Sequence, residues 1–558
     1  MTADLEVETL DHLGLIAGVI DELGLVELTD SLLPEHTLSC VSSGQVVKAM
    51  ILNCLGFVSA PLYLFSEFFA SKPVSHLLGA GVLASHLNDD RLGRVLDGLY
   101  ANGTTMFFLK AAMQAVSRFG VETDQLHLDS SSFAVTGEYV VDAVVAPMPE
   151  GTEAVPPRDD MQPITICRGY SRDHRPDLKQ YMLNLVCSRD GGVPLWLKVA
   201  SGNQSDAQTF AGVVTEFASQ WNLDSMFVID AAFYSEPNLQ QVSSLQWLSR
   251  VPQTLSAAKA LIQQSTDELT PVDCPLKDYQ MWETTADYGG IEQRWILIES
   301  QTRKADAVLW EKEVERLERR LNRELKQLQK TVFACRPDAC EALIQFQAQL
   351  EKHQLVKLRI APVQTKHKPG TPRDAKRDNA FIGYRIYATL ELKPEAAAEF
   401  ACQRSRFILA TNQLDTQKWP ASKLLQEYKQ QQKVERGFRF LKDPLFFTSS
   451  VFVKKPQRVE ALALIMALTL LVYTLAERKI RQGLDSTQQT VLDQRQRPSD
   501  NPTFRWILQK FQGIHLVTLN GLQQITNLSV ERQLIIRLLG PPTCRYYLLP
   551  ELWPTCGM

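Results

Sequence analysis

The chain has 558 residues, 45% of them hydrophobic, and a formal net charge of −4. This length predicts three or four domains with sizeable cores. The acidic N-terminus lacks the basic segment of a signal peptide. The apolar run 461–475 is shorter than the roughly 20 residues that cross a bilayer, which predicts a buried helix. Ten cysteines form no Cys-x-x-Cys pair, so we expect reduced thiols in a cytoplasmic protein without membrane association.

The charge is unevenly distributed along the chain. Residues 1–47 contain nine Asp or Glu and no Lys or Arg. Residues 423–481 contain twelve Lys or Arg and five Asp or Glu, a net charge of +7. Local basic patches, rather than total charge, attract polyanions such as nucleic acids. A solvated helix face is the alternative interpretation of this basic segment.

Residues 1–120 are predicted to be mostly helical, because apolar residues recur every three or four positions in segments such as 13–23. From residue 122 the pattern is typical of strands. Asp190-Gly191-Gly192 is a hairpin signal between the second and third of these strands. The four predicted strands are 125–129, 180–187, 193–199 and 225–230.

About 175 residues separate the fourth strand from a fifth at 406–411. Within them, apolar residues at 310–328 recur with helical spacing between dense charges, which predicts an amphipathic or coiled-coil helix. A basic helix at 420–442 and an apolar helix at 457–478 follow. The predicted organisation is a helical N-terminal domain for DNA binding or dimerisation at 1–120, two halves of a core at 121–245 and 405–482, an insertion domain at 246–404, and a C-terminal extension at 483–558.

Three acids stand where a site can form. Asp129 ends the first strand, Asp230 ends the fourth, and Glu435 lies on the basic helix after the fifth. If the first and fourth strands are neighbours, the aspartates lie side by side and the helix lays its Glu across them. Three clustered carboxylates repel one another unless cations bind, and Mg²⁺ prefers oxygen ligands. The alternatives are turn or cap aspartates and an ion pair between Glu435 and Arg439.

The basic helix has a regular spacing around Glu435. Tyr428, Glu435 and Lys442 are seven residues apart each time, which places them on one face of a continuous helix. The remaining cations of this run, Lys429, Lys433, Arg436 and Arg439, surround the acid with positive charge.

A second group of cations precedes the second strand. An arginine guanidinium can bind two phosphate oxygens at once, so this segment is a candidate DNA contact. The alternative is a solvated loop with internal pairs to Asp173 and Asp177. The four cations of this group are Arg168, Arg172, Arg175 and Lys179.

Trp282 and Trp295 lie in the insertion, where either base stacking or a place in the core suits them, and we favour the core.

The order of strand acid, strand acid, insertion and helix Glu resembles the DDE transposases of bacterial insertion sequences. The helix is similar to the subgroup with the signature Tyr-x2-Arg-x3-Glu-x6-Lys and a β-rich insertion before the Glu. Tyr428, Glu435 and Lys442 match this signature, and Gln431 replaces its Arg. The segments Leu128–Ser130, Gly169–Lys179, Gly202–Asp206 and Ile229–Ser235 also resemble the family.

The resemblance implies an α/β fold, with a ribonuclease-H-like mixed sheet flanked by helices and interrupted by a β-rich and helical insertion. It also implies binding to double-stranded DNA at terminal inverted repeats, strand cleavage, and joining to target DNA by a homodimer on paired ends, with 310–328 as a dimer contact. Asp129, Asp230 and Glu435 are then the catalytic ligands of two Mg²⁺ ions, with Mn²⁺ as a substitute. Tyr428 and Lys442 hold phosphates, and Lys433 or Arg436 supplies the contact missing at Gln431.

Two other functions are compatible with the same residues. A metal-dependent ribonuclease-H-like nuclease would cut nucleic acid without joining it to a target. A decayed transposase would only occupy DNA ends, and Gln431 is the one feature that favours it. Strand joining separates the first from a transposase, and metal-dependent cleavage separates the second.

Overall fold

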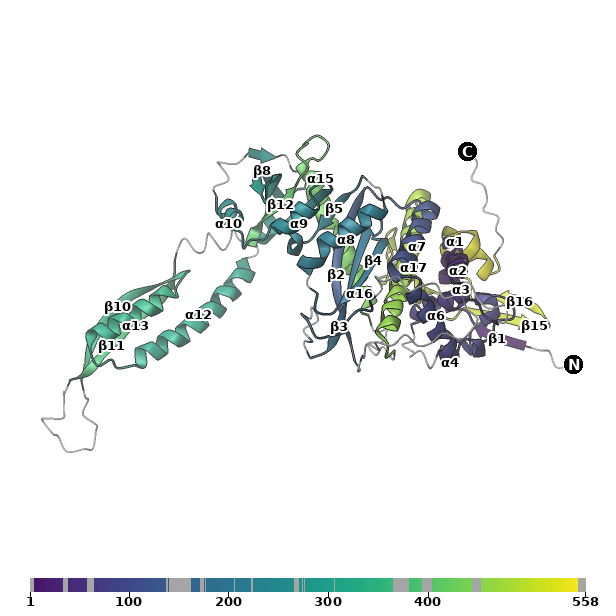
Figure 1. Ribbon diagram of the computed structural model, residues 1–558, viewed down its shortest axis with the longest axis horizontal. Coiled ribbons are helices and arrows are strands. Elements are labelled where there is room, and N and C mark those ends of the chain that lie inside the picture. The colour runs from purple at the N-terminus through teal and green to yellow at the C-terminus, as the bar shows by residue number, and fades with distance from the viewer. Residues whose placement is uncertain are drawn as a thin grey trace, which may run out of the picture. The chain divides into compact units, whose positions relative to one another are not determined.

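The computed structural model divides into two compact units (Figure 1). The first comprises residues 1–249, 288–291 and 424–558, and the second comprises 250–287 and 292–423. Only the backbone is described for residues 206–209, 270, 304–305, 307–311, 313 and 432–435. The structure describes residues 5–33, 39–57, 65–136, 139, 162–170, 175, 177–204, 206–221, 224–264, 270–272, 274, 276–305, 307–364, 381–393, 404–443 and 453–549.

A mixed sheet forms the centre of the first unit. Its strand order is β4-β3-β2-β5-β6, with β2, β3 and β4 antiparallel and β2, β5 and β6 parallel. This arrangement confirms the predicted ribonuclease-H-like mixed sheet. Gly191 and Gly192 take positive φ values of 82° and 68° in the β3–β4 turn, as the hairpin signal requires. The strands are β2 (Gln125–Val135), β3 (Lys179–Ser188), β4 (Pro194–Ser201), β5 (Met226–Ile229) and β6 (Gln246–Arg250).

Helices cover this sheet. Strands β2 and β3 are buried along nearly their whole length, as expected for strands covered on both faces. The helices α7 and α17 pack on β4, and α8 and α16 pack on β2. Their bounds are Thr104–Phe119 for α7, Asp206–Gln220 for α8, Gln432–Leu441 for α16 and Pro456–Thr487 for α17.

Helix α17 is the long apolar helix that the sequence predicts. Within the described residues, it is the one helix whose length and hydropathy would suffice to cross a membrane. However, 78% of its apolar window is buried inside the protein. It packs on α3, α6, α7, α19 and β4, so it is a core helix of the first unit.

The N-terminal region is helical, as predicted, and it shares its core with the C-terminal extension. Strand β1 (Leu5–Thr9), which the sequence analysis did not predict, pairs with β15 (His515–Leu519), and β15 pairs with β16 (Leu522–Ile525). The N-terminal helices are α1 (Leu13–Leu23), α2 (Leu25–Leu32), α3 (Ser43–Cys54), α4 (Phe65–Phe69), α5 (Val74–Leu78) and α6 (Asp89–Ala101). The C-terminal helices are α18 (Phe504–Lys510), α19 (Val530–Leu539) and α20 (Pro541–Tyr546).

A hydrogen-bonded polar triad links α1, α3 and α20. The Lys48 ammonium donates to the Asp21 carboxylate and, at 2.7 Å, to the Tyr546 hydroxyl, which itself donates to Asp21. Burial lowers the pKa of Lys48, and the Asp21 carboxylate opposes this shift. Cys544 and Tyr547 are also buried. The C-terminal extension is therefore an integral part of the first unit up to Tyr547.

One strand assignment differs from the sequence analysis. Residues 246–250, expected to begin the insertion domain, form β6, which pairs with β5 as the fifth strand of the core sheet. Residues 406–411 form the predicted strand, β12, but this strand belongs to the second unit. The sequence did not show which of these two short apolar strands belongs to the core sheet, because they differ only in the strands with which they pair.

The second unit contains a sheet with the order β12-β9-β8-β7. The buried Arg406 guanidinium donates to the buried Glu299 carboxylate at 2.8 Å, which ties β12 to β9. Trp282 and Trp295 are buried, as the core interpretation predicts. The strands are β7 (Thr270–Val272), β8 (Tyr279–Tyr288), β9 (Ile291–Ser300) and β12 (Arg406–Thr411), with α10 at Ser256–Gln263 and α11 at Gln301–Ala305.

Helices α12 (Ala307–Lys330) and α13 (Arg336–Ala348) pack against the hairpin of β10 (His353–Gln364) and β11 (Phe381–Leu392) (Figure 1). The apolar face of α12 contributes Leu321 and Leu325 to a core with Phe346 and Leu350. Helix α12 is therefore amphipathic, as one of the two predictions expected, and its apolar face packs against other residues of the same chain. The short elements are η2 (Ala84–His86), η3 (Ala231–Phe233), α9 (Glu236–Gln241), β13 (Val491–Leu492) and β14 (Pro498–Ser499).

The first prediction concerns Arg478 of α17. Its guanidinium is buried and donates to the Asp190 carboxylate at 2.7 Å and to the carbonyls of Phe119 and Gly120. Arg478→Ala leaves these acceptors unpaired and lowers the free energy of unfolding by about 3 kcal/mol. Arg319→Ala, which removes an exposed ion pair with Glu315, costs less than about 0.5 kcal/mol. Urea unfolding measures both, and equal losses would contradict the prediction.

The second prediction concerns His12. Burial lowers its pKa to about 4, although its hydrogen bond to the Leu55 carbonyl and the nearby Asp11 favour the protonated form. Its neutral form therefore stabilises the fold fully above pH 6.5, and this contribution is lost as the pH falls toward 4. Between pH 7 and pH 4.5 the wild-type protein loses about 2 to 3 kcal/mol more than His12→Gln in urea unfolding. Parallel losses in both proteins would refute this role.

Candidate active site

Asp129 and Asp230 occupy neighbouring positions in the core sheet. Strands β2 and β5 pair in parallel with Leu128 opposite Ile229. Asp129 is the next residue of β2, and Asp230 directly follows β5. Adjacent strands lie about 4.8 Å apart, so the aspartates stand side by side at the end of this pairing. The sequence analysis expected the two aspartates side by side. It also expected the first strand to end at Asp129, which is wrong, because β2 continues to Val135 through its pairing with β3.

The two aspartates have different surroundings. Asp129 lies within β2 and is only 9% exposed, and its Oδ1 accepts the N–H of Ser130 at 2.8 Å. Burial, and then the Asp129 carboxylate, raise the pKa of the Cys187 thiol on β3. Asp230 is half-buried and precedes η3, and its backbone carbonyl accepts the Ser249 hydroxyl at 3.3 Å. The site is thus fixed to strands β2, β3, β5 and β6.

The predicted basic helix is divided. Residues 420–442 form α15 (Ala421–Gln430) and α16 (Gln432–Leu441), which are separated at Gln431. Gln431 keeps helical angles, φ −53° and ψ −27°, so the chain departs only locally from a helix. Glu435 lies within α16 and Lys442 caps its C-terminus, whereas Tyr428 lies on α15. The prediction of one uninterrupted helix is therefore wrong at Gln431, where the chain divides into α15 and α16.

Helix α16 lies against β2 and α17. Phe438 and Leu441 are its buried residues among the described side chains. Gly437 permits close approach to α17, because a Cβ at this position would lie 3.3 Å from Leu470 Cδ2. The Lys442 ammonium lies 5.4 Å from the ring centre of Phe133 on β2, a cation–π contact. Phe133 is four residues beyond Asp129 on the same face of the strand.

The structure thus brings Asp129 and Asp230 together and packs the helix that carries Glu435 on the strand of Asp129. The side chains of Lys433 and Glu435 lie outside the described residues. No group of three His, Cys, Asp or Glu gathers among the side chains that are described. Two adjacent carboxylates nevertheless match the hard oxygen ligands of Mg²⁺, and their mutual repulsion favours a bound cation.

The remaining predicted cations differ in their surroundings. Arg436 and Arg439 are exposed on α16, and Arg168 is exposed before β3. Lys179 begins β3 opposite Val135. Arg172 lies outside the described residues.

Arg175 has an acidic partner in its own loop. Its guanidinium binds the Asp177 carboxylate at 2.8 Å, and this exposed pair is the arrangement that the solvated-loop alternative expects. This hydrogen bond is the main cause of the lowered pKa of Asp177.

Two features near the site were missed from the sequence. Glu427 on α15 is buried and lies 3.4 Å from the Arg189 guanidinium, which anchors α15 to the β3–β4 turn. Gly169 and Gly202 lie where a Cβ would come within 2.0 Å of the carbonyl oxygens of Gly202 and Gln180. The two glycines could have been found from the sequence, because glycine is the residue that allows two backbone segments to approach this closely. The burial of Glu427 could not, because nothing in the local pattern distinguishes it from a surface acid.

Comparisons with known proteins agree with this geometry. Residues 128–472 match the model of the transposase DDE domain, and residues 5–113 match a domain of unknown function, DUF4277. No curated protein sequence matches the chain significantly. Because the first match spans more than half of the sequence and includes all three candidate acids, the chain belongs to the DDE transposase domain family. Members of this family generally use divalent metal ions.

A solved structure shares a distant likeness with the chain. It is the cryo-electron microscopy structure of a synaptic complex of the piggyBac transposase with hairpin DNA. The sequences are 9% identical, the match covers 96% of this chain and 80% of that chain, and the TM-score is 0.35. A likeness at this level says nothing about the activity of this chain.

Proposed function

We propose that this transposase binds the terminal inverted repeats of a bacterial insertion sequence, cleaves the DNA ends and joins them to target DNA. The observation that carries the proposal is the register of β2 and β5, which sets Asp129 beside Asp230 on a ribonuclease-H-like sheet. Parallel pairing holds both carboxylates on rigid strands. This suits chemistry that depends on positioning rather than on a covalent enzyme intermediate.

Glu435 is the third carboxylate in this proposal. Lys442 contacts Phe133, and Glu435 precedes Lys442 by seven residues, about 10 Å along a helix. Asp129 precedes Phe133 by four residues, about 13 Å along a strand. These similar lengths support a path of α16 along β2 in which the backbone position of Glu435 is level with Asp129.

The three carboxylates fit two Mg²⁺ ions, with Mn²⁺ as a substitute. When bound, the ions supply activation of the attacking oxygen and stabilisation of the leaving oxygen. The chain itself holds the carboxylates in register and excludes water from the buried side of Asp129. Lys442 at the end of α16 and Tyr428 on α15 are proposed to hold the DNA phosphates beside the scissile bond.

Further cations are proposed to follow the DNA backbone. Arg436 and Arg439 on α16 and Arg168 before β3 are exposed and carry charges suited to phosphate. Lys179, Lys433, Arg172 and Gln431 complete the proposed contact set, and Arg175 joins it when DNA displaces Asp177. We propose that the protein acts as a homodimer on paired DNA ends in the bacterial cytoplasm.

The proposal predicts the effect of removing one carboxylate at a time. Asp129→Asn, Asp230→Asn and Glu435→Gln each reduce Mg²⁺-dependent cleavage by about a thousand-fold or more, equivalent to about 4 kcal/mol of barrier. DNA binding without metal remains, since each change removes negative charge. Labelled duplexes from the DNA flanking the reading frame, with a target plasmid, measure cleavage and joining. Asp500→Asn, which removes an exposed acid of the C-terminal extension outside the site, retains activity.

The same assay separates the alternatives. Cleavage without joining would identify a nuclease. Binding by the wild-type protein without cleavage, in Mg²⁺ or Mn²⁺, would identify a decayed DNA-binding protein. Full activity in Asp129→Asn would remove the aspartates from the mechanism.

Gln431 provides a gain-of-function prediction. Gln431→Arg restores the cation of the family signature at the junction of α15 and α16, so it strengthens DNA binding at low salt. The plot of log affinity against log salt concentration steepens by about 0.9, as expected for one added phosphate contact. Gln426→Arg adds the same charge at an exposed position of α15 more than a turn away and leaves this slope unchanged. Equal slopes for the two variants would place the junction away from DNA.

A further inference from the structure

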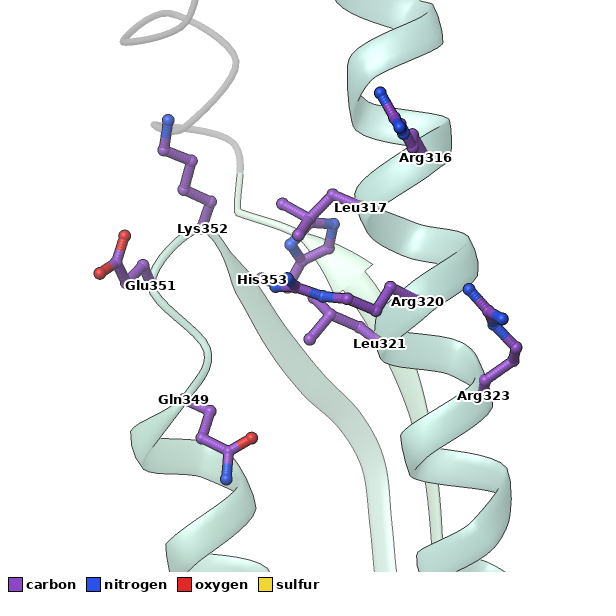
Figure 2. Close-up of a pocket in the computed structure, with 9 residues that line it drawn as sticks. All are labelled: Arg316, Leu317, Arg320, Leu321, Arg323, Gln349, Glu351, Lys352 and His353. Carbon is purple, nitrogen blue, oxygen red and sulfur yellow. The ribbon is translucent and has the colours of Figure 1, made fainter. Parts of the chain in front are cut away.

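The second unit contains a hollow beside α12 to which none of the predicted site residues belongs. Its volume is about 610 Å³, and it lies between α12, the end of α13 and the start of β10 (Figure 2). Leu317 and Leu321 of α12 provide apolar wall. The other lining residues are Arg316, Arg320, Arg323, Gln349, Glu351, Lys352 and His353.

The hollow is strongly cationic. It is lined by three arginines and one lysine but only one acid, Glu351. Within the part of the chain that the structure describes, the side chains of Arg316 and Arg320 make no hydrogen bond or ion pair. Of the nearby acids, Glu315 pairs with Arg319 at 3.2 Å, and Glu318 lies 3.6 Å from Nε2 of His353, which itself lines the hollow. Positive charge is therefore available to a ligand.

The arginines form a regular row on α12. Arg316, Arg320 and Arg323 follow i, i+4 and i+7 spacing, which places them on one stripe about 10 Å long. One DNA strand advances about 3.4 Å per phosphate along the helix axis, so this stripe spans roughly three phosphates. A second hollow of about 520 Å³ shares Arg316 and Arg323 and adds Lys312 and the Arg319–Glu315 pair, so it continues the row along the helix with a net positive lining.

A buried polar group also faces this hollow. His353 is 1% exposed, and its Nε2 makes no hydrogen bond. Figure 2 shows its ring between β10 and α12, beside Arg320 and Leu317. The Glu318 carboxylate, 3.6 Å from this nitrogen, is just beyond hydrogen-bond distance, so a ligand oxygen or a water can still satisfy it. Apolar walls with one sign of charge also focus the field on an incoming anion.

We propose that this hollow, the arginine hollow, binds the phosphate backbone of duplex DNA. The inference rests on the proposed function, which requires the chain to hold DNA, and it adds a contact surface remote in sequence from the carboxylates. Arg316 and Arg320 bind phosphate oxygens through their guanidinium forks, and Arg323 and Lys352 add charge. Backbone contacts of this kind supply affinity and orientation without reading sequence.

The test compares two matched double variants of the full-length protein. Arg316→Ala/Arg320→Ala removes two charges from the hollow. Lys326→Ala/Lys330→Ala removes two charges from exposed positions nearer the C-terminus of the same helix, outside both hollows. Fluorescence anisotropy measures affinity for a labelled duplex from the flanking DNA and for one of scrambled sequence, over a series of salt concentrations without metal.

The arginine variant is expected to weaken binding to both duplexes at least tenfold, and to reduce the slope of log affinity against log salt concentration by about 2. The lysine variant retains the wild-type slope. Equal slopes for the two variants, or a loss confined to one duplex, would overturn the arginine hollow as a backbone site.

The cleavage assay on wild-type protein distinguishes this failure from failure of the proposed function. If the wild-type protein cleaves and joins DNA while Arg316→Ala/Arg320→Ala binds it normally, only the arginine hollow is refuted. If the wild-type protein neither binds nor cleaves the flanking or scrambled duplex, the proposed function and this inference fall together.

Discussion

Burial of α17 is the constraint on which the first unit depends. This helix of 32 residues is roughly 48 Å long and packs on both the core sheet and the N-terminal helices. Charged residues toward its two ends fix its position. Arg458 pairs with Asp97 on α6 at 2.7 Å, and Arg478 reaches Asp190 in the β3–β4 turn. Because one apolar helix serves both regions, the N-terminal region and the sheet form one compact unit.

The position of α17 also determines where the helix of Glu435 lies. Gly437 allows α16 to approach Leu470, and Phe440 packs on Tyr473 with ring centres 4.2 Å apart. The Arg505 guanidinium of α18 then binds Asp443, just beyond the end of α16. A substitution that shifted α17 would therefore move α16 over β2, even though no residue of α17 belongs to the candidate site. Side chains far from the carboxylates thus contribute to their arrangement.

The local parts of this arrangement could be predicted from the sequence, and the non-local parts could not. Asp129 and Asp230 each come after residues typical of a strand, so neighbouring residues alone predict that both lie on or next to a strand. Strand β2 continues past Asp129 to Val135 because these residues pair with β3, which no local pattern shows. The pairing of β1 with β15 joins segments about 500 residues apart, and the bond from Lys48 to Tyr546 spans 498 residues. No local pattern encodes such partners. The break at Gln431 was missed because its neighbours all favour a helix and its own angles remain helical.

The candidate carboxylates and the basic surfaces of the chain carry opposite charges, so they are suited to different roles. Carboxylates that bind metal ions repel DNA until cations neutralise them, so the affinity of a DDE transposase for DNA must come largely from basic side chains elsewhere. Around α16, basic residues lie close to Glu435 in sequence, where their charge both attracts phosphate and offsets the acids. The arginine hollow is lined by one acid, Glu351, against three arginines and one lysine, and Glu315 beside it pairs with Arg319. It is therefore suited to binding alone, and its contribution should depend on salt but not on the metal ion.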